Sequence, residues 1–197
     1  MGGLADPLFE VGPWTCVELD SDAVPTLQAF FEANPGYHLA VEGRVPGPHA
    51  AREEFESPPP AEWGYNKRWM LGFLAAGGEM IAMASVVSNL LAEGVWHLGL
   101  FIVATSLHGN GTAHELYGGL ESWMRVKGAR WLRLGVVDGN RRAERFWRRH
   151  GFVEVRRRLG VQMGERVNEV CVMAKPLDGG VLSEYLALVV RDRPESP

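Results

Sequence analysis

The sequence has few cysteines. Only Cys16 and Cys171 occur among its 197 residues, and neither has a second Cys or a His at metal-ligand spacing. This excludes a disulfide framework and a cysteine-based metal centre, so no metal is expected. Each cysteine lies in an apolar run, which predicts two buried thiols in a reducing compartment.

Long hydrophobic runs are also missing. No apolar run approaches the about 18 residues that a membrane span needs, and residues 1–13 contain acids but no basic residue. A membrane partner and a secretory signal are therefore not expected, and we expect a cytoplasmic protein. Because 46% of the residues are hydrophobic and 22% are charged, the chain can bury a core. We expect one domain over residues 1–177 and a C-terminal extension over 178–197 whose end looks frayed.

Basic residues are scarce in the first third of the chain. Residues 1–62 contain only Arg44 and Arg52 against eleven acids, whereas residues 125–158 contain twelve basic residues against three acids. The basic segment indicates either a polyanionic ligand or a solvated arginine-rich helix face. The acidic third could attract a cationic amine or a basic peptide.

Hydrophobic periodicity predicts the order β-α-β-β-β-α-β-α-β-β. The expected fold class is α/β (α+β), a single domain whose mixed central sheet of about seven strands is flanked by helices. The predicted strands are residues 14–19, 69–76, 80–87, 95–103, 131–137, 152–163 and 167–175, with the second and third joined in a hairpin through Gly77-Gly78. The predicted helices begin at Asp20–Asp22, cover residues 111–127 and 141–150, and include at most a brief helix at residues 50–55. On the helix at 111–127, Leu116, Leu120 and Met124 form one apolar stripe. The strands at 95–103 and 131–137 flank this helix and could run parallel.

A glycine-rich loop, His108-Gly-Asn-Gly-Thr-Ala113, separates a long apolar strand from a helix. Glycines let a pyrophosphate approach the backbone, and the first turn of a helix offers unpaired N–H groups. The alternative is a plain strand-to-helix turn. The loop is not that of nucleotide hydrolases, because no Gly-Lys-Ser/Thr follows, and it lacks the third glycine of a dinucleotide fingerprint.

The segment from Val103 to Ala113 resembles the acetyl-CoA loop of the GNAT superfamily of N-acetyltransferases. That pattern is Arg/Gln-x-x-Gly-x-Gly/Ala with a Val five residues before it, and here Val103, Gly111 and Ala113 match while His108 replaces the Arg or Gln. A second segment, 140–152, is similar to the family's Asn-x-x-Ala-x-x-Phe-Tyr-x-x-x-Gly-Phe. Five of its six marker residues agree, and Trp147 replaces the Tyr.

The resemblance implies an N-acetyltransferase that uses acetyl-CoA. It also implies a sheet that splays between its fourth and fifth predicted strands, where the pantetheine arm would enter. The cofactor would contact the strand residues Phe101, Ile102 and Val103, with Val103 offering its backbone to the pantetheine arm. The pyrophosphate would lie on the amides of the loop. The remaining implied cofactor contacts are His108, Gly109, Asn110, Gly111, Thr112, Ala113, Asn140, Ala143, Phe146 and Trp147. Arg141, Arg142 and Arg145 could meet the 3′-phosphate or could form a solvated face.

The implied reaction is direct attack of a primary amine on the thioester. His97, Glu93 and Asn140 are the candidate catalytic residues. By strand alternation His97, Gly99, Phe101 and Val103 share one side of their strand, which would aim His97 at the site as a base. Glu93 or a chain of water molecules is the alternative. The indole of Trp147 cannot give up its proton. Three alternatives follow: the CoA thiolate leaves unprotonated, it takes a proton from another residue or from water, or the chain is a weak enzyme.

The acceptor side is expected to use the first helix, the segment from Asn34 to Pro60 and the last hairpin, with Tyr37 and Trp63 among the aromatic residues available. The expected acceptor is a small molecule, amino acid or peptide amine. The runner-up is a non-catalytic CoA-binding or sensor protein of the same fold. Nucleic-acid binding through the arginines is disfavoured by the acidic remainder of the chain. The stretch Val181–Val190 could pack on the domain or contribute to a homodimer.

Overall fold

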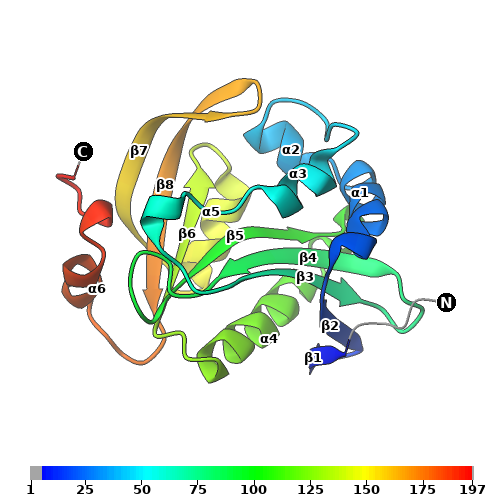
Figure 1. Ribbon diagram of the computed structural model, residues 1–197, viewed down its shortest axis with the longest axis horizontal. Coiled ribbons are helices and arrows are strands. Elements are labelled where there is room, and N and C mark those ends of the chain that lie inside the picture. Colours follow the sequence, from blue (N-terminus) through cyan, green and yellow to red (C-terminus); the bar gives the residue numbers. More distant parts are fainter. Residues whose placement is uncertain (1–5, 197) are drawn as a thin grey trace.

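The computed structural model describes residues 6–196, and over this range one mixed sheet has helices on both faces (Figure 1). Its eight strands lie in the order β1-β2-β3-β4-β5-β6-β8-β7. They are β1 (Pro7–Val11), β2 (Trp14–Glu18), β3 (Arg68–Leu74), β4 (Met80–Val87), β5 (Val95–Val103), β6 (Trp131–Val137), β7 (Val153–Met163) and β8 (Arg166–Pro176). The α-helices are α1 (Val24–Ala33), α2 (Gly36–Val41), α3 (Ala50–Glu56), α4 (Thr112–Val126), α5 (Arg141–Arg149) and α6 (Leu182–Leu188).

The predicted single-domain α/β architecture is confirmed, with two additions in the first third of the chain. The strand β1 raises the count from about seven to eight. It is an edge strand of five residues that pairs only with β2. A strand this short shows no clear alternation of apolar and polar residues in the sequence. The helix α2 begins directly after Asn34 and Pro35, where the sequence predicted only the end of a helix.

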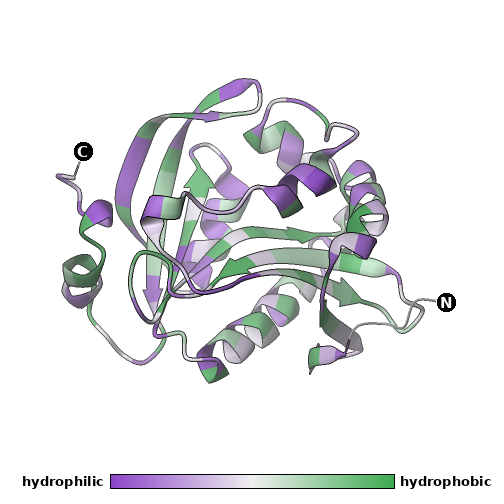
Figure 2. Ribbon diagram, viewed as in Figure 1, coloured by the Kyte–Doolittle hydropathy of each residue, from purple (hydrophilic) through white to green (hydrophobic). Residues whose placement is uncertain are grey.

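Two apolar layers cover the sheet. On one face, α4 and α5 pack against strand residues such as Leu132 and Leu134, and the stripe Leu116, Leu120 and Met124 predicted on α4 is fully buried. On the other face, α1 packs on Leu100 and Ile102 of β5. In Figure 2 the central strands are largely hydrophobic while the edge strand β7 is largely hydrophilic. The sheet therefore separates an α4/α5 side from an α1–α3 side.

The strands β5 and β6 run parallel but pair over only part of their length. Val95–Leu98 pair with Trp131–Leu134, and beyond this point the ladder between the two strands ends. The predicted splay is thus confirmed. Because β1 precedes the strand expected as the first, the splay falls between β5 and β6 in the observed numbering.

A β-bulge at Gly99 overturns the expected sidedness of β5. Ser85 of β4 pairs with Leu100 and Val86 pairs with Leu98, so Gly99 is an extra residue in β5. One extra residue reverses the alternation of the side chains. Phe101 therefore faces the α4/α5 side with Trp96 and Leu98, and His97 lies on the opposite side from Phe101.

The C-terminal extension packs back onto the domain. The helix α6 buries Tyr185 against Trp131 of β6, and the 3₁₀ turn that follows buries Asp192 completely. Asp192 pairs with Arg133 at 2.7 Å (Nε to Oδ2) and accepts a hydrogen bond of 2.5 Å from the Tyr185 hydroxyl. A buried ion pair thus holds the segment to the sheet, which corresponds to one of the two placements considered for it, packing on the domain.

Two further expectations concern single features. Cys16 and Cys171 are both buried free thiols, as predicted, and burial raises the pKa of each. Among the described residues, no helix is long and apolar enough to cross a membrane.

Candidate active site

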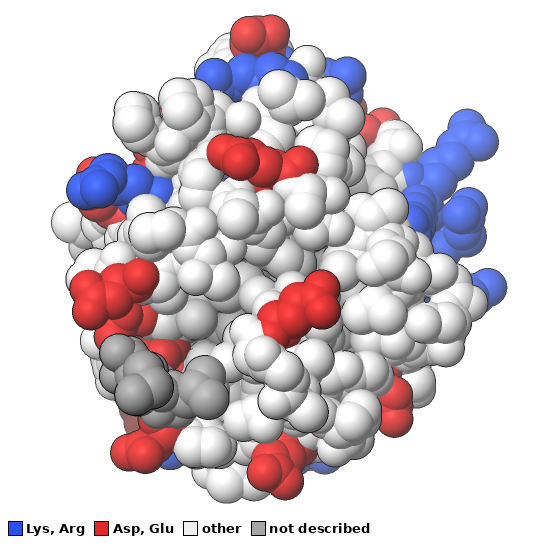
Figure 3. Space-filling model, turned by 90° about the vertical axis from the view of Figure 1, so that its right-hand side faces the viewer, with Lys and Arg blue, Asp and Glu red and all other residues white. Residues whose placement is uncertain are grey.

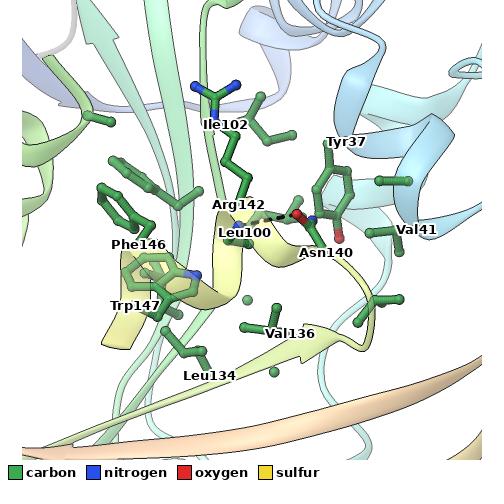
Figure 4. Close-up of a pocket in the computed structure, with 18 of the residues that line it drawn as sticks. Tyr37, Val41, Leu100, Ile102, Leu134, Val136, Asn140, Arg142, Phe146 and Trp147 are labelled. Carbon is green, nitrogen blue, oxygen red and sulfur yellow. Dashed lines mark hydrogen bonds between the residues drawn. The ribbon is translucent and has the colours of Figure 1, made fainter. Parts of the chain in front are cut away.

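A cavity of about 910 Å³ lies where β5 and β6 separate, and it is lined from both faces of the sheet. The glycine loop and α5 line it on the α4/α5 side, and α2 and β7 line it on the other side. Figure 4 shows Phe146 and Trp147 of α5 across the cavity from Tyr37 and Val41 of α2. Parting the strands thus joins two surfaces that a continuous sheet would keep apart.

The glycine loop requires its glycines for the backbone conformation. Gly109 and Gly111 have φ of +86° and +95°, and no atom lies within 4 Å of a Cβ placed on either. These φ values belong to the left-handed region that side chains disfavour. The loop therefore presents its backbone to open space at the first turn of α4.

Most amides of this loop are free to bind a ligand. Within residues 6–196, the N–H groups of Gly109, Asn110, Gly111 and Ala113 donate to no other group. The Thr112 amide is the exception, because it donates to the Asn110 side chain at 3.1 Å. Unpaired amides at the positive end of a helix dipole fit the charge of a pyrophosphate.

His108, which replaces the family's Arg or Gln, connects β5 to α5. Its Nε2 lies 2.8 Å from the Val103 carbonyl oxygen, and its Nδ1 lies 2.8 Å from the Arg142 guanidinium. Since a guanidinium only donates, Nδ1 accepts and Nε2 donates its proton to Val103. The carbonyl predicted to meet the pantetheine arm is thus already hydrogen-bonded to His108.

Asn140 begins α5 as its N-cap. Its side-chain oxygen accepts a hydrogen bond of 3.2 Å from the Ala143 amide, which stabilises the first turn of the helix. The side-chain nitrogen of Asn140 donates to no group among the described residues. The cap therefore fixes a residue that lines the cavity and leaves it one donor for a ligand.

Trp147 occupies the position where the family pattern has Tyr. The indole is 8% exposed and packs against Phe101, Tyr117 and Phe152. Its nitrogen points toward the cavity in Figure 4. This group can donate a hydrogen bond there but cannot deliver a proton.

Tyr37 supplies a phenol on the opposite wall. It is half-buried, lines the cavity, and its hydroxyl points inward in Figure 4. Burial raises the pKa of the Tyr37 phenol, and the nearby Glu54 and Glu42 carboxylates raise it further. The hydroxyl therefore keeps its proton and is a hydrogen-bond donor at neutral pH.

His97 lines the cavity on the α1–α3 side, opposite to Phe101. Its Nδ1 lies 3.1 Å from the Arg133 carbonyl oxygen and 3.4 Å from the Arg133 guanidinium. The shorter contact is to an oxygen that only accepts, so we assign the proton to Nδ1, which leaves Nε2 as the free acceptor. Burial and the Arg133 cation lower the pKa of His97 to about 3. The imidazole is neutral, but its pKa works against the predicted role as a base.

The remaining predicted residues divide into those at the cavity and those away from it. The lining includes the following predicted residues: Phe101, Ile102, Val103, His108, Gly109, Gly111, Ala113, Asn140, Ala143, Phe146 and Trp147. Asn110 and Thr112 shape the loop but are not lining residues. Glu93 is exposed in the turn before β5 and does not line the cavity either.

Several lining residues were not predicted from the sequence. Arg158 and Met163 of β7 and Arg133 of β6 form part of the wall, and Asp192 holds Arg133 from the C-terminal segment. The predicted acceptor-side elements are present as α2 and the β7–β8 hairpin, but no residue of α1 lines the cavity. No local pattern marks a side chain whose position depends on pairing between distant strands.

Comparison with known proteins is consistent with this arrangement. A family model described as "Acetyltransferase (GNAT) family" matches residues 27–152. A search of curated protein sequences found no match.

Solved structures resemble the chain over most of its length. An acetyltransferase from Thermus thermophilus has a TM-score of 0.66 and 18% identity, covering 86% of this chain and 100% of that one. The ribosomal-protein-S18-alanine N-acetyltransferase of Escherichia coli has a TM-score of 0.61 and 16% identity, covering 85% and 96%. A spermidine N-acetyltransferase from Vibrio cholerae, solved with CoA and spermine, has a TM-score of 0.64 and 15% identity, covering 83% and 95%.

A mixed sheet opened between two parallel strands, with a glycine loop at the start of the following helix, defines an acyltransferase of the N-acetyltransferase class. The particular family follows from the match over residues 27–152: the chain belongs to the GNAT acetyltransferase family.

Proposed function

We propose that this enzyme transfers the acetyl group of acetyl-CoA to a primary amine by direct attack. The observation that carries the proposal is the cavity at the β5/β6 separation, which joins the glycine loop to a second wall formed by α2 and β7. A donor held on one side of the sheet and an acceptor held on the other meet between the strands. No covalent enzyme intermediate is needed, which agrees with the burial of both cysteines.

The loop and α5 fit the cofactor. The free amides of Gly109, Asn110, Gly111 and Ala113 would bind the pyrophosphate, and the free amide nitrogen of Asn140 would donate to the cofactor beside the start of α5. Among the lining residues of α5, Arg142 and Arg145 would meet the 3′-phosphate. Bound acetyl-CoA supplies the thioester whose acetyl group passes to the amine, with release of the CoA thiol and loss of one amine proton.

Tyr37 is the group on this chain best suited to hydrogen-bond the departing sulfur. Its phenol is protonated and lines the cavity, whereas the Trp147 indole holds its proton permanently. A hydrogen bond to the charge that develops on a leaving group lowers the barrier to its departure. We assign this role to Tyr37, with Trp147 as a second, non-transferring donor.

The proton of the amine requires a different acceptor. His97 faces the acceptor side through its free Nε2, but a pKa of about 3 makes it a poor match for an amine. Glu93 is exposed away from the cavity. We therefore propose that the amine binds deprotonated or loses its proton to water, and that His97 orients it by accepting a hydrogen bond.

Thermal unfolding of the purified protein tests the cofactor side. Acetyl-CoA and CoA should raise the midpoint, while ATP and NAD at the same concentration should not, because only a ligand of the native state stabilises it. Release of free thiol on adding a panel of primary amines then tests transfer. If neither CoA species raises the midpoint at millimolar concentration, the proposal fails. Binding without thiol release for any amine would favour a CoA sensor instead.

A further inference from the structure

The charges around the cavity are of one sign. No carboxylate is among the described residues that line it, and its charged side chains are arginines. Arg142, Arg145 and Arg149 lie on α5, on the cofactor side. Arg133 and Arg158 lie on the acceptor side, where a cationic substrate would be repelled.

Only one of the two acceptor-side arginines has its charge compensated. Arg133 is 4% exposed and forms a bidentate pair with Asp192. Within residues 6–196, the Arg158 guanidinium forms no hydrogen bond or ion pair. Arg158 is therefore a partly exposed cation at the wall of the cavity that no carboxylate neutralises, so it is available to bind an anion there.

The register of the sheet directs Arg158 into the cavity. On β7, Arg158 pairs with Val170 of β8, and Val170 pairs with Val137 of β6. Paired residues share a face, and all three of these residues line the cavity. Because neighbouring strands lie about 5 Å apart, the Cα of Arg158 is about 10 Å from that of Val137, within three residues of the Asn140 cap.

The adjacent Arg157 shows the contrast. It pairs with Cys171 on the other face of the sheet, where its guanidinium contacts Glu154, Asp138 and Glu169 at 2.8, 3.0 and 2.8 Å. These three carboxylates thus form ion pairs with Arg157. Arg158, one residue later, forms no ion pair with a carboxylate among the described residues.

Neighbouring cations add to the positive potential at Arg158, which favours the binding of an anion there. Burial lowers the pKa of Arg158, and the cations of Arg191, Arg156 and Arg133 lower it further, while Asp192 opposes them. Arg191 itself stacks over the Trp63 ring at 4.5 Å. An anion beside Arg158 would relieve the mutual repulsion of this group.

The acids of the first third do not line the cavity, although Glu42 and Glu54 lie near Tyr37 and line a smaller neighbouring pocket. Glu54 pairs with Arg68, Glu42 with Arg44, and Glu18 with Lys67. Figure 3 shows acidic side chains scattered in separate patches over the outside of this part of the molecule. The cationic amine or basic peptide suggested by the acidic sequence does not match the wall that an acceptor would touch.

Besides the polar side chains of Tyr37 and His97, the acceptor side has several apolar contacts. Val41 of α2, Leu100 of β5, and Val161 and Met163 of β7 complete this wall. It suits a small apolar body with an anionic group at the β7 end and an amine toward the opening between β5 and β6.

We propose that the acceptor is an amine that carries a carboxylate, such as an apolar amino acid, and that Arg158 binds this carboxylate. The inference rests on the proposed acetyl transfer and narrows its substrate class. A guanidinium binds a carboxylate through two parallel hydrogen bonds, so it fixes the orientation of the acceptor as well as holding its charge.

The test compares matched acceptors on the full chain with acetyl-CoA: leucine, its carboxamide and isopentylamine, and the same three forms of methionine. Thiol release gives KM and kcat for each. We expect the amino acids to have KM values about tenfold to a hundredfold below those of the partners that lack the carboxylate, the usual worth of a hydrogen-bonded charge. Arg158→Met should remove this discrimination by raising KM for the acids only, and Arg158→Glu should invert it in favour of the amines.

Arg157→Met is the matched control, with the same charge change on the same strand but on the other face, and its KM values should equal those of the wild type. Equal KM values for the acid and amine forms, or unchanged discrimination in Arg158→Met, would overturn the inference. If no acceptor is turned over, calorimetric titration of the CoA-loaded protein with N-acetyl-leucine measures binding of the product instead. Absence of binding would also overturn the inference that Arg158 binds a carboxylate. Acetyl-CoA binding is measured on the same samples. If acetyl-CoA does not bind, the proposed acetyl transfer fails; if it binds but the discrimination is absent, only the inference about the carboxylate fails.

Discussion

At the scale of single residues, the chemistry of this site depends on which groups keep their protons. Trp147 stands where a phenol is expected, and the phenol in the cavity comes instead from Tyr37 of α2. The pKa shifts of Tyr37 and His97 both favour the neutral form, since burial disfavours charge on either side chain. The acceptor side is therefore a site where fixed arginine charges surround neutral donors and acceptors.

Replacing Tyr37 by Phe removes the proposed donor with little change in volume. We expect kcat to fall about a hundredfold, the lower range for a lost acid, while the affinity for acetyl-CoA and the unfolding midpoint stay near wild type. Steady-state thiol release and calorimetry measure the two quantities. Tyr65→Phe, which alters an exposed tyrosine away from the cavity, serves as the control. An unchanged kcat in Tyr37→Phe would refute the assignment.

Gly111→Ala tests the loop. At φ of +95° an alanine is strained, and the loop is expected to shift the amides that would bind the pyrophosphate. The Kd for CoA should rise at least about tenfold, with a loss of about 1 kcal/mol in the free energy of unfolding. Gly78→Ala places the same strain, at φ of +83°, in the β3–β4 turn, and it should destabilise the protein similarly without changing the Kd. Equal Kd values in the two variants would show that the loop does not bind the cofactor.

At the scale of elements, the C-terminal segment supports the wall of the site through Arg133. The 3₁₀ turn after α6 brings Asp192 beneath the acceptor wall, where it pairs with Arg133 beside His97. Burial alone would raise the pKa of Asp192, but hydrogen bonds and the charge of Arg133 outweigh it and lower that pKa. The segment thus fixes the position of Arg133 on the acceptor side of β6 through the ion pair with Asp192.

Asp192→Asn breaks this buried pair and leaves Arg133 without a counter-charge. We expect a loss of about 3–5 kcal/mol in the free energy of unfolding, as for other buried pairs that lose one partner, measured by urea titration. Asp178→Asn lies in the same segment but alters an exposed contact of 3.9 Å to Arg125, so its effect should stay below about 1 kcal/mol. Similar small losses in both variants would mean that the segment is not anchored by Asp192.

At the scale of the whole molecule, charge is divided between regions. The acids of the first third pair locally or lie scattered on the surface, and the arginines of α5 and β7 meet at one cavity. An acidic protein of net charge −4 thereby presents a basic site. Such a site favours anionic ligands on both sides, a CoA and, by our inference, a carboxylate.

The stability of the whole fold should fall in mild acid. Burial lowers the pKa of His97 to about 3 and that of His150 to about 4, the latter also because of His114. Below pH about 6.5 the unfolded chain binds these protons while the native state does not, so the free energy of unfolding decreases as pH falls. Each imidazole contributes a slope of up to about 1.4 kcal/mol per pH unit. Urea titrations at pH 7, 6 and 5 should show a smaller loss in His97→Gln than in the wild type, and identical slopes would contradict the prediction.

The sequence by itself determined the features that depend on local backbone chemistry. The glycine loop, the Asn140 cap, the stripe on α4 and the parallel placement of β5 and β6 all follow from residue types at short spacings, and the family match agrees with them. Cofactor-side residues such as Gly111 and Asn140 could be named because a positive φ or a helix cap leaves a signature within a few positions.

Only the tertiary structure decided the acceptor side. The bulge at Gly99 turns His97 to the opposite side from Phe101, the register of β7 aims Arg158 into the cavity, and Asp192 reaches Arg133 across 59 positions of the chain. These arrangements depend on how distant strands and segments pair, and a shift of one residue exchanges the two faces of a strand. The local pattern therefore identifies the glycine loop, whereas strand register and long-range packing determine which side chains line the opposite wall of the cavity.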